Sequence, residues 1–227
     1  MIPLLQNPVY HSLRLNDSHL GFGAENVMAF DEAVSPFAGF EQGYGDGFSD
    51  LYELLPPGRT ILYATPQRIT TPKQWELLAA VEGLQFLYDG PTPEEAPAFA
   101  PIPLTEEQVP QMIALAQLTK PGPFGPRTIE FGHYHGIFSN GQLVAMTGQR
   151  LHVAQYTEIS AVCTHPDHLG KGYAAALVHH QVGLIVQAGQ VPFLHVRADN
   201  QRAIAVYERL HFKVQGPMNF YFMQKKN

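Results

Sequence analysis

The chain has 227 residues, long enough for one large domain or two small ones, with 45% hydrophobic and 15% charged residues. This composition is typical of a globular protein and excludes an intrinsically disordered chain. The formal net charge is −6, and no cluster of Lys and Arg rises above this acidic background. We therefore expect no binding to nucleic acid.

A single cysteine, Cys163, excludes an intramolecular disulfide and suits a reducing compartment. The N-terminal residues Met1 to Leu5 have no basic region and no long apolar run, so they predict no signal peptide. The longest apolar stretches are well short of the ~18 residues that a membrane span requires. The expected location is the cytoplasm, with no membrane association.

The first hundred residues give weaker structural signals. Residues 59–65 and 85–88 look like strands, and residues 73–81, which follow Pro72, have a helical pattern. Residues 37–48 hold four glycines and four aromatic rings. Such a loop is usually local packing and otherwise a substrate lid.

A proline-rich segment follows between residues 90 and 103, where five prolines restrict the backbone. It predicts an extended linker and a division into two units, residues 1–100 and 101–227. The first unit would be a subdomain that covers the acceptor side of a site, or a degenerate second copy of the fold that follows.

The elements after the linker come in a regular order. Thr105 to Gln108 forms a capping box that starts a helix running to about Thr119. Asn140-Gly141 predicts a tight turn between strands 134–138 and 143–151. The elements expected beyond it are strand 156–164, helix 172–188, strand 191–196, helix 200–210, and closing strands 212–214 and 220–223. This order predicts an α/β (α+β) domain with a mixed sheet.

One turn in this domain has the features of an anion site. Leu169-Gly170-Lys171-Gly172-Tyr173-Ala174 leads from a strand into a helix, and its two glycines let a ligand approach the backbone. Amide groups at a helix start have no partner within the helix, so they can bond a diphosphate. Plain packing is the alternative explanation of the glycines. The dinucleotide-binding spacing is absent, because residue 175 is alanine.

A second segment strengthens this interpretation. His195 to Asn200 ends a strand and starts a helix that contains Ala203 and Tyr207. Asn200 and Tyr207 lie two helical turns apart and share one face. Ala203 lies on the same face and leaves room for a thin ligand chain.

Together these segments resemble the GNAT superfamily of acyl-CoA-dependent N-acyltransferases. The family's Gln/Arg-x-x-Gly-x-Gly/Ala signature matches Leu169 to Ala174, and its later Asn, Ala and Tyr match Asn200, Ala203 and Tyr207. The resemblance covers roughly residues 105–223 and implies a GNAT-like, largely antiparallel mixed sheet flanked by helices. Leu169 departs from the signature's Gln or Arg, which predicts a modest loss of affinity for coenzyme A.

The resemblance also implies roles for individual residues, with acetyl-CoA or another short acyl-CoA as co-substrate. Those expected to contact it are Val162, Cys163, Thr164, Leu169, Gly170, Lys171, Gly172, Tyr173, Ala174, Asn200 and Ala203. Tyr207 would protonate the leaving thiolate, or else only pack against the last strands. Glu158 would accept a proton from the amine, as a glutamate at this spacing does in some family members. The alternative for Glu158 is a solvent-facing residue or a salt bridge to Arg150 or Arg197.

Other chemistry receives less support from the sequence. The pairs His133/His135 and His165/His168 join no clear third ligand, so we expect no metal site. Cys163 could form an acyl-cysteine, but a small packing residue is the more ordinary role. Residues 121–128 are expected near the acceptor, and the net charge mildly favours a cationic amine.

The sequence thus supports an N-acetyltransferase that acts on a small-molecule or peptide amine by direct attack in a ternary complex. Two alternatives remain open at this point. One is a non-catalytic acyl-CoA-binding sensor or regulatory module, and the other is an unrelated α/β protein that binds a nucleotide phosphate.

Overall fold

The computed structural model describes residues 1–93 and 99–226. Eight strands form the main sheet, in the order β4 (Thr60–Thr65), β11 (Phe212–Lys225), β5 (Trp75–Tyr88), β10 (Val191–Arg197), β9 (Tyr156–Thr164), β8 (Gln142–Val153), β7 (His135–Ser139) and β6 (Ile102–Pro103). All neighbours pair antiparallel except β9 and β10, which are parallel. The predicted mixed, largely antiparallel sheet is confirmed.

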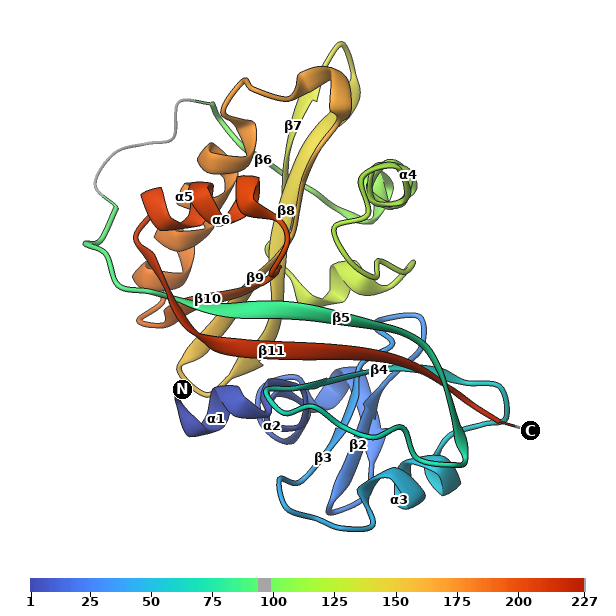
Figure 1. Cartoon of the computed structure of the whole chain (residues 1–227). Helices are drawn as coiled ribbons and strands as arrows, with labels where there is room; N and C mark the ends of the chain where they lie inside the picture. The colour runs from blue at the N-terminus through green and yellow to red at the C-terminus, as the bar shows by residue number, and fades with distance from the viewer. Residues whose placement is uncertain (94–98, 227) are drawn as a thin grey trace.

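Helices cover both faces of the sheet around β8 and β9. Figure 1 shows α5 (Tyr173–Gln187) and α6 (Gln201–Arg209) on one side and α4 (Val109–Thr119) on the other. Helix α4 follows a 3-10 turn, η2 (Glu106–Gln108), in which the side chain of Gln108 accepts a hydrogen bond from the N–H of Thr105. Helices α5 and α6 agree with the predicted segments to within one residue at each end, and α4 ends where predicted but begins after the 3-10 turn, which occupies the predicted first turn.

The N-terminal residues add a three-stranded sheet and three helices, and one of these helices, α2, packs against β8. The elements are α1 (Pro3–Gln6), α2 (Pro8–Arg14), η1 (Ser18–Leu20), β1 (Gly21–Gly23), β2 (Val27–Phe30), β3 (Ala38–Phe40) and α3 (Gly47–Leu54). Buried Asp17 accepts hydrogen bonds from the backbone N–H and, at 2.7 Å, the imidazole of His152. These bonds attach the N-terminal segment to β8.

Strands from both sides of the predicted boundary at residue 100 share the main sheet. β4 and β5 come from the first hundred residues, and β5 lies between β10 and β11. The largest hydrophobic cluster likewise joins Leu5, Phe30 and Phe37 to Met146 and Phe193. The division into two units stays a prediction, but any such units have one sheet and one core in common.

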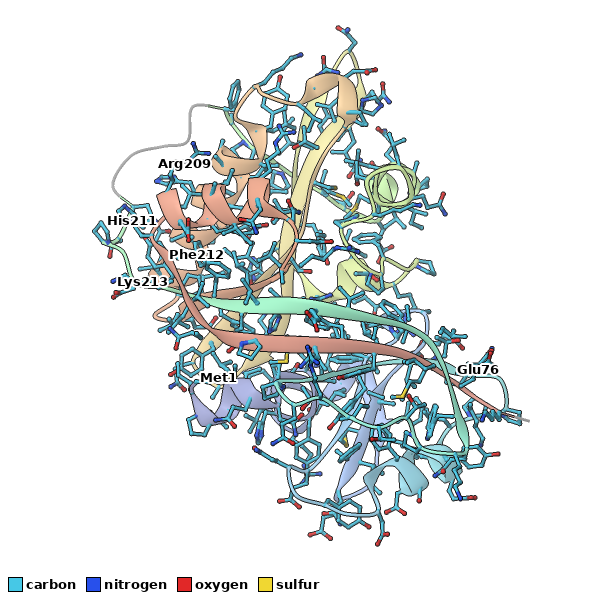
Figure 2. The ribbon with its side chains drawn as sticks, in the orientation of Figure 1. Met1, Glu76, Arg209, His211, Phe212 and Lys213 are labelled. Carbon is cyan, nitrogen blue, oxygen red and sulfur yellow. The ribbon has the colours of Figure 1, made fainter. Side chains whose placement is uncertain are left out.

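The prediction of a helix over residues 73–81 is wrong, because these residues begin the long strand β5. Ala, Leu and Glu favour helices, but β5 pairs with β11 along its whole length, and this pairing outweighs the local preference. The two closing strands predicted over 212–223 are one strand with a bulge after Val214. Figure 2 shows this ribbon crossing the molecule from Phe212 to the neighbourhood of Glu76.

The predicted turn at Asn140-Gly141 is confirmed. Their φ angles are 52° and 78°, and they connect β7 to β8. Within the predicted linker, residues 90–93 and 99–101 have no regular structure, but its last two residues form the short strand β6. The remainder, residues 94–98, lies outside the described residues. Two further 3-10 turns, η3 (Thr128–Phe131) and η4 (Pro166–His168), precede β7 and α5.

Candidate functional site

The parallel strands β9 and β10 pair only at their beginning. The register covers Tyr156 to Glu158 of β9 and Val191 to Phe193 of β10 and then stops. Beyond it lies a cavity of about 530 Å³, lined by β9, the turn before α5, the end of β10 and α6. We call it the β9–β10 cavity. A ligand in it would lie between two strands whose facing edges are not paired with each other.

A bulge in β9 exposes backbone groups to this cavity. The pairing with β8 passes from Met146↔Cys163 to Gly148↔Ser160, so Ala161 and Val162 together oppose one residue. Ala161 has a φ of 54°, in the left-handed region. Because a bulge removes residues from the hydrogen-bond ladder, backbone groups near Val162 are available to a ligand.

The turn before α5 has the geometry that an anion needs. Gly170 and Gly172 have φ angles of 80° and 81°, and a Cβ added to either would meet no atom within 4 Å. The first hydrogen bond of the helix joins the N–H of Ala176 to the carbonyl of Gly172 at 3.0 Å. The amides of the preceding helical residues, Tyr173 to Ala175, therefore have no partner within the helix. These residues line the cavity at the positive end of the helix dipole.

Side chains around this turn add positive charge. Lys171 lies with its Nζ 3.2 Å from Nδ1 of His168. Lys171 itself does not line the cavity, whereas Arg202 and Arg209 of α6 do, and Figure 2 labels Arg209 at the end of that helix. Leu169 is 47% exposed and offers no polar atom. The Leu169 side chain therefore cannot make the polar contact that Gln or Arg makes at the first position of the signature.

Helix α6 places Asn200 and Tyr207 along the same cavity. Asn200 caps the helix, with its Oδ1 accepting a bond from the N–H of Ala203 at 3.1 Å. This leaves the Asn200 amide NH₂ to bond a ligand. Tyr207 is buried, and burial, with a smaller effect of Cys163, raises its pKa to about 12. The phenol therefore holds its proton at neutral pH, and its raised pKa makes it a weaker proton donor than an exposed tyrosine.

Cys163 belongs to β9, is buried, and lies next to Tyr207 of α6. Burial raises the pKa of its thiol to about 11. Since the thiolate is the reactive form, a thiol with this pKa is a poor nucleophile near neutral pH. The environment favours the packing role for this residue over an acyl-cysteine.

Glu158 belongs to a buried polar cluster rather than to a free edge of the cavity. Its side chain has no exposed surface and forms two 2.8 Å bonds with the guanidinium of Arg150. Its Oε1 is 2.7 Å from Nδ1 of His195, and Nε2 of His195 is 2.9 Å from the amide of Gln85. Burial alone would raise the pKa of Glu158, but Arg150 and His195 lower it to about 2.

A second cavity, of about 660 Å³, lies on the other side of this cluster. We call it the aromatic cavity, because Phe37, Phe124, Phe220 and Phe222 line it together with aliphatic residues. The two cavities share one wall, formed by Lys120, Pro121, Arg150, His195, Val196 and Arg197. The segment 121–124, part of the loop expected near the acceptor, lines the aromatic cavity.

The arrangement brings together most of the residues singled out from the sequence. Val162 to Thr164, Leu169, Gly170, Gly172 to Ala174, Asn200, Ala203 and Tyr207 all line the β9–β10 cavity, and so does Glu158. The salt bridge between Glu158 and Arg150 was one of the open alternatives, and the structure contains it. Sequence reasoning missed Lys120 and His195 as wall residues. His195 directly precedes the second motif, which was a usable signal, whereas nothing local marks Lys120.

Two properties of the described residues bear on other functions. Within residues 1–93 and 99–226, no three His, Cys, Asp or Glu side chains are grouped closely enough to hold a metal ion. No helix in the same ranges combines the length and apolar character that crossing a membrane demands.

Comparison with solved structures identifies the family. A GNAT-family protein from Novosphingobium aromaticivorans is 32% identical, with a TM-score of 0.89, over 98% of this chain and 99% of its own. The chain belongs to the GNAT family. The family model described as FR47-like protein also matches, over residues 134–222.

Other solved structures share the fold at lower identity. A GCN5-related N-acetyltransferase from Kribbella flavida is 14% identical, with a TM-score of 0.62, over 97% of this chain and 96% of its own. A Drosophila protein is 12% identical, with a TM-score of 0.66, over 99% and 90%. No curated protein sequence matches. The similarity to the Novosphingobium protein extends over the N-terminal residues as well, since it covers 98% of this chain.

Proposed function

We propose that this GNAT protein is an N-acyltransferase that moves an acetyl or other short acyl group from acyl-CoA to an amine. One observation supports this most directly: the β9–β10 cavity and the aromatic cavity meet at a single wall. Two substrates can therefore occupy the protein together and react at the wall. Direct attack in a ternary complex needs this arrangement, because holding both reactants in place removes much of the entropic barrier.

The β9–β10 cavity fits acyl-CoA at both of its ends. The amides after Gly172, with Lys171 beside them, would hold the diphosphate. The pantetheine arm would bond backbone groups of β9 from Val162 to Thr164 on one side and the NH₂ of Asn200 on the other. Ala203, with its small side chain, leaves space for the arm to reach Tyr207.

The proposed reaction forms a C–N bond and breaks a C–S bond. The neutral amine attacks the thioester carbonyl carbon, and a backbone N–H of β9 stabilises the developing oxyanion, a contribution of about 3 kcal/mol for one such donor. Tyr207 donates its proton to the departing thiolate and regains one from solvent. The nitrogen of the attacking amine loses one further proton to solvent as the C–S bond breaks, so the products are an amide and a free thiol.

Glu158 as proton acceptor stays a prediction, and its surroundings support a different role. A carboxylate with a pKa of about 2 that already accepts bonds from Arg150 and His195 is a weak base. We propose that Glu158 is a positioning residue that fixes these two side chains at the shared wall. The amine then loses its ammonium proton to solvent before attack. Under this proposal kcat/KM rises with pH up to the pKa of the acceptor amine itself.

The test of the function is release of thiol from acetyl-CoA in the presence of a panel of amines. Tyr207→Phe should lower kcat by about 10²-fold or more, because it removes the acid, while the Kd for acetyl-CoA changes little. Tyr88→Phe is the matched control, since the Tyr88 hydroxyl bonds the carbonyl of Pro91, and Tyr88 lines neither cavity. A Tyr207→Phe variant with unchanged turnover would remove the acid assignment.

The second candidate function is an acyl-CoA-binding regulatory module without turnover. The observation that favours it is the ion-paired state of Glu158, which leaves the wall without a free carboxylate base. Tight binding of acetyl-CoA with no thiol release from any amine in the panel would support this module over the enzyme.

A further inference from the structure

The aromatic cavity has a charge pattern that limits which amines can enter it. Among the described residues that line it, Lys120, Arg150 and Arg197 carry positive charge, and none is Asp or Glu. The remainder are mainly aromatic, aliphatic and proline side chains. A polycationic amine would meet repulsion here and no compensating carboxylate.

The three cations differ in how much charge they offer to a ligand. Arg150 is already paired with buried Glu158, and Arg197 with Asp199 at 2.7 Å. Lys120 is exposed, and within the described chain no carboxylate lies within 4.0 Å of its ammonium group. Lys120 is therefore the cation of this wall that is free to bind an anionic ligand.

The position of Lys120 determines where that anion would lie. Lys120 lines both cavities, so it stands at the wall where an acceptor amine must meet the thioester. Its φ of 51°, at the C-terminal cap of α4, turns the chain there into the Pro121 to Phe124 loop. An anionic group bound by Lys120 would thus be close to the reacting amine, with the rest of the molecule among the phenylalanines.

We propose that the acceptor is an α-amino acid with a large apolar side chain, whose carboxylate binds Lys120 and whose side chain fills the aromatic cavity. This deepens the proposed function and rests on it. A volume of about 660 Å³ is within the usual range for small-molecule pockets and admits an aromatic or long aliphatic group. The neighbouring cations also lower the pKa of a bound ammonium group, which favours the neutral amine that attacks.

The experiment compares phenylalanine with phenylalaninamide, which lacks the carboxylate charge and has a less basic amino group, and with spermidine as a polycation. Each kcat/KM is referred to the concentration of the neutral amine. The wild-type protein should use phenylalanine best. Lys120→Gln should lower kcat/KM for phenylalanine about tenfold and change it less than twofold for the amide, because a charge-assisted bond is lost only with the acid. Lys73→Gln, an exposed lysine that lines neither cavity, should change neither value.

A second variant adds charge instead of removing it. Gln117 is exposed and lines the aromatic cavity, so Gln117→Glu places a carboxylate there with little effect on folding. We expect the ratio of kcat/KM for phenylalanine to that for the amide to fall several-fold. An unchanged ratio in both variants, or a wild-type preference for spermidine, would overturn the proposed acceptor while leaving the acyltransferase function intact.

Binding of the product gives a reading that does not depend on turnover. With coenzyme A present, N-acetylphenylalanine should bind more tightly than N-acetylphenylalaninamide, and Lys120→Gln should remove the difference. Equal binding of the two products, or binding of neither, would overturn the proposal that the acceptor is an amino acid. Failure to bind acetyl-CoA at all would instead overturn the proposed function.

Discussion

The two cavities that meet at Arg150 and His195 are built in different ways. The β9–β10 cavity depends largely on backbone: a bulge at Ala161, glycines at 170 and 172, and the free amides of α5. The aromatic cavity is made of side chains from Phe37 to Phe222, gathered from both halves of the chain. A backbone site suits a ligand common to a whole family, whereas a side-chain site can differ in each protein. Under the proposed function, the first cavity would hold the acyl donor and the second would set the specificity for the acceptor.

The largest expected effect comes from the wall that both cavities share. Glu158→Gln leaves Arg150 buried without its carboxylate, so unfolding free energy should fall by about 3–5 kcal/mol. Urea denaturation at neutral pH measures this loss. The exposed pair of Arg68 and Glu82 is the control, because Glu82→Gln should cost less than about 1 kcal/mol. Equal losses in the two variants would contradict the structural role of Glu158.

The same variant predicts a pH dependence. The pKa of Glu158 is lowered from 4.5 to about 2 in the folded protein, so its contribution is present in full above pH 4.5. As the pH falls from 4.5 towards 2, that contribution is lost. The difference in unfolding free energy between the wild-type protein and Glu158→Gln should therefore shrink by up to about 3 kcal/mol across this window. Denaturation at successive pH values measures the difference, and a constant difference would contradict the assigned ion pair.

An intermediate effect is expected at the turn before α5, and it should concern only binding of the acyl donor. Gly172→Ala puts a side chain at a φ of 81° and near the proposed diphosphate, so the Kd for acetyl-CoA should rise about tenfold. The strain should also lower stability by about 1 kcal/mol. Gly183→Ala in the same helix, where an added Cβ meets nothing within 4 Å, should leave the Kd unchanged. Titration of each variant with acetyl-CoA makes the comparison.

These differences explain which parts of the molecule could be predicted from sequence. The turn at 169–174 and the helix from Asn200 to Tyr207 are local patterns, so their positions beside one cavity followed from spacing and from the family resemblance. The pairing of β5 with β11 joins residues more than a hundred positions apart, and helix-favouring residues 76–80 hid the strand. The bridge from Glu158 to Arg150 joins directly opposed residues of the neighbouring strands β8 and β9, and it was among the alternatives that the sequence offered. The contact of Glu158 with His195 and the gathering of the aromatic cavity join distant parts of the chain and had no local signal.

The smallest expected effect concerns the departure at the first position of the signature. Leu169→Gln restores a polar side chain beside the diphosphate site, so the Kd for acetyl-CoA should fall about threefold, as one added hydrogen bond allows. Leu118→Gln, at another exposed leucine that lines neither cavity, should have no effect. A Kd that does not change in Leu169→Gln would mean that the backbone amides alone bind the diphosphate.

The most direct measurement is equilibrium dialysis of the wild-type protein with labelled acetyl-CoA. We expect one molecule bound per chain, displaced fully by unlabelled coenzyme A and weakened by Gly172→Ala but not by Lys120→Gln. The absence of saturable binding, or binding that Gly172→Ala leaves intact, would contradict the assignment of the β9–β10 cavity to the acyl donor.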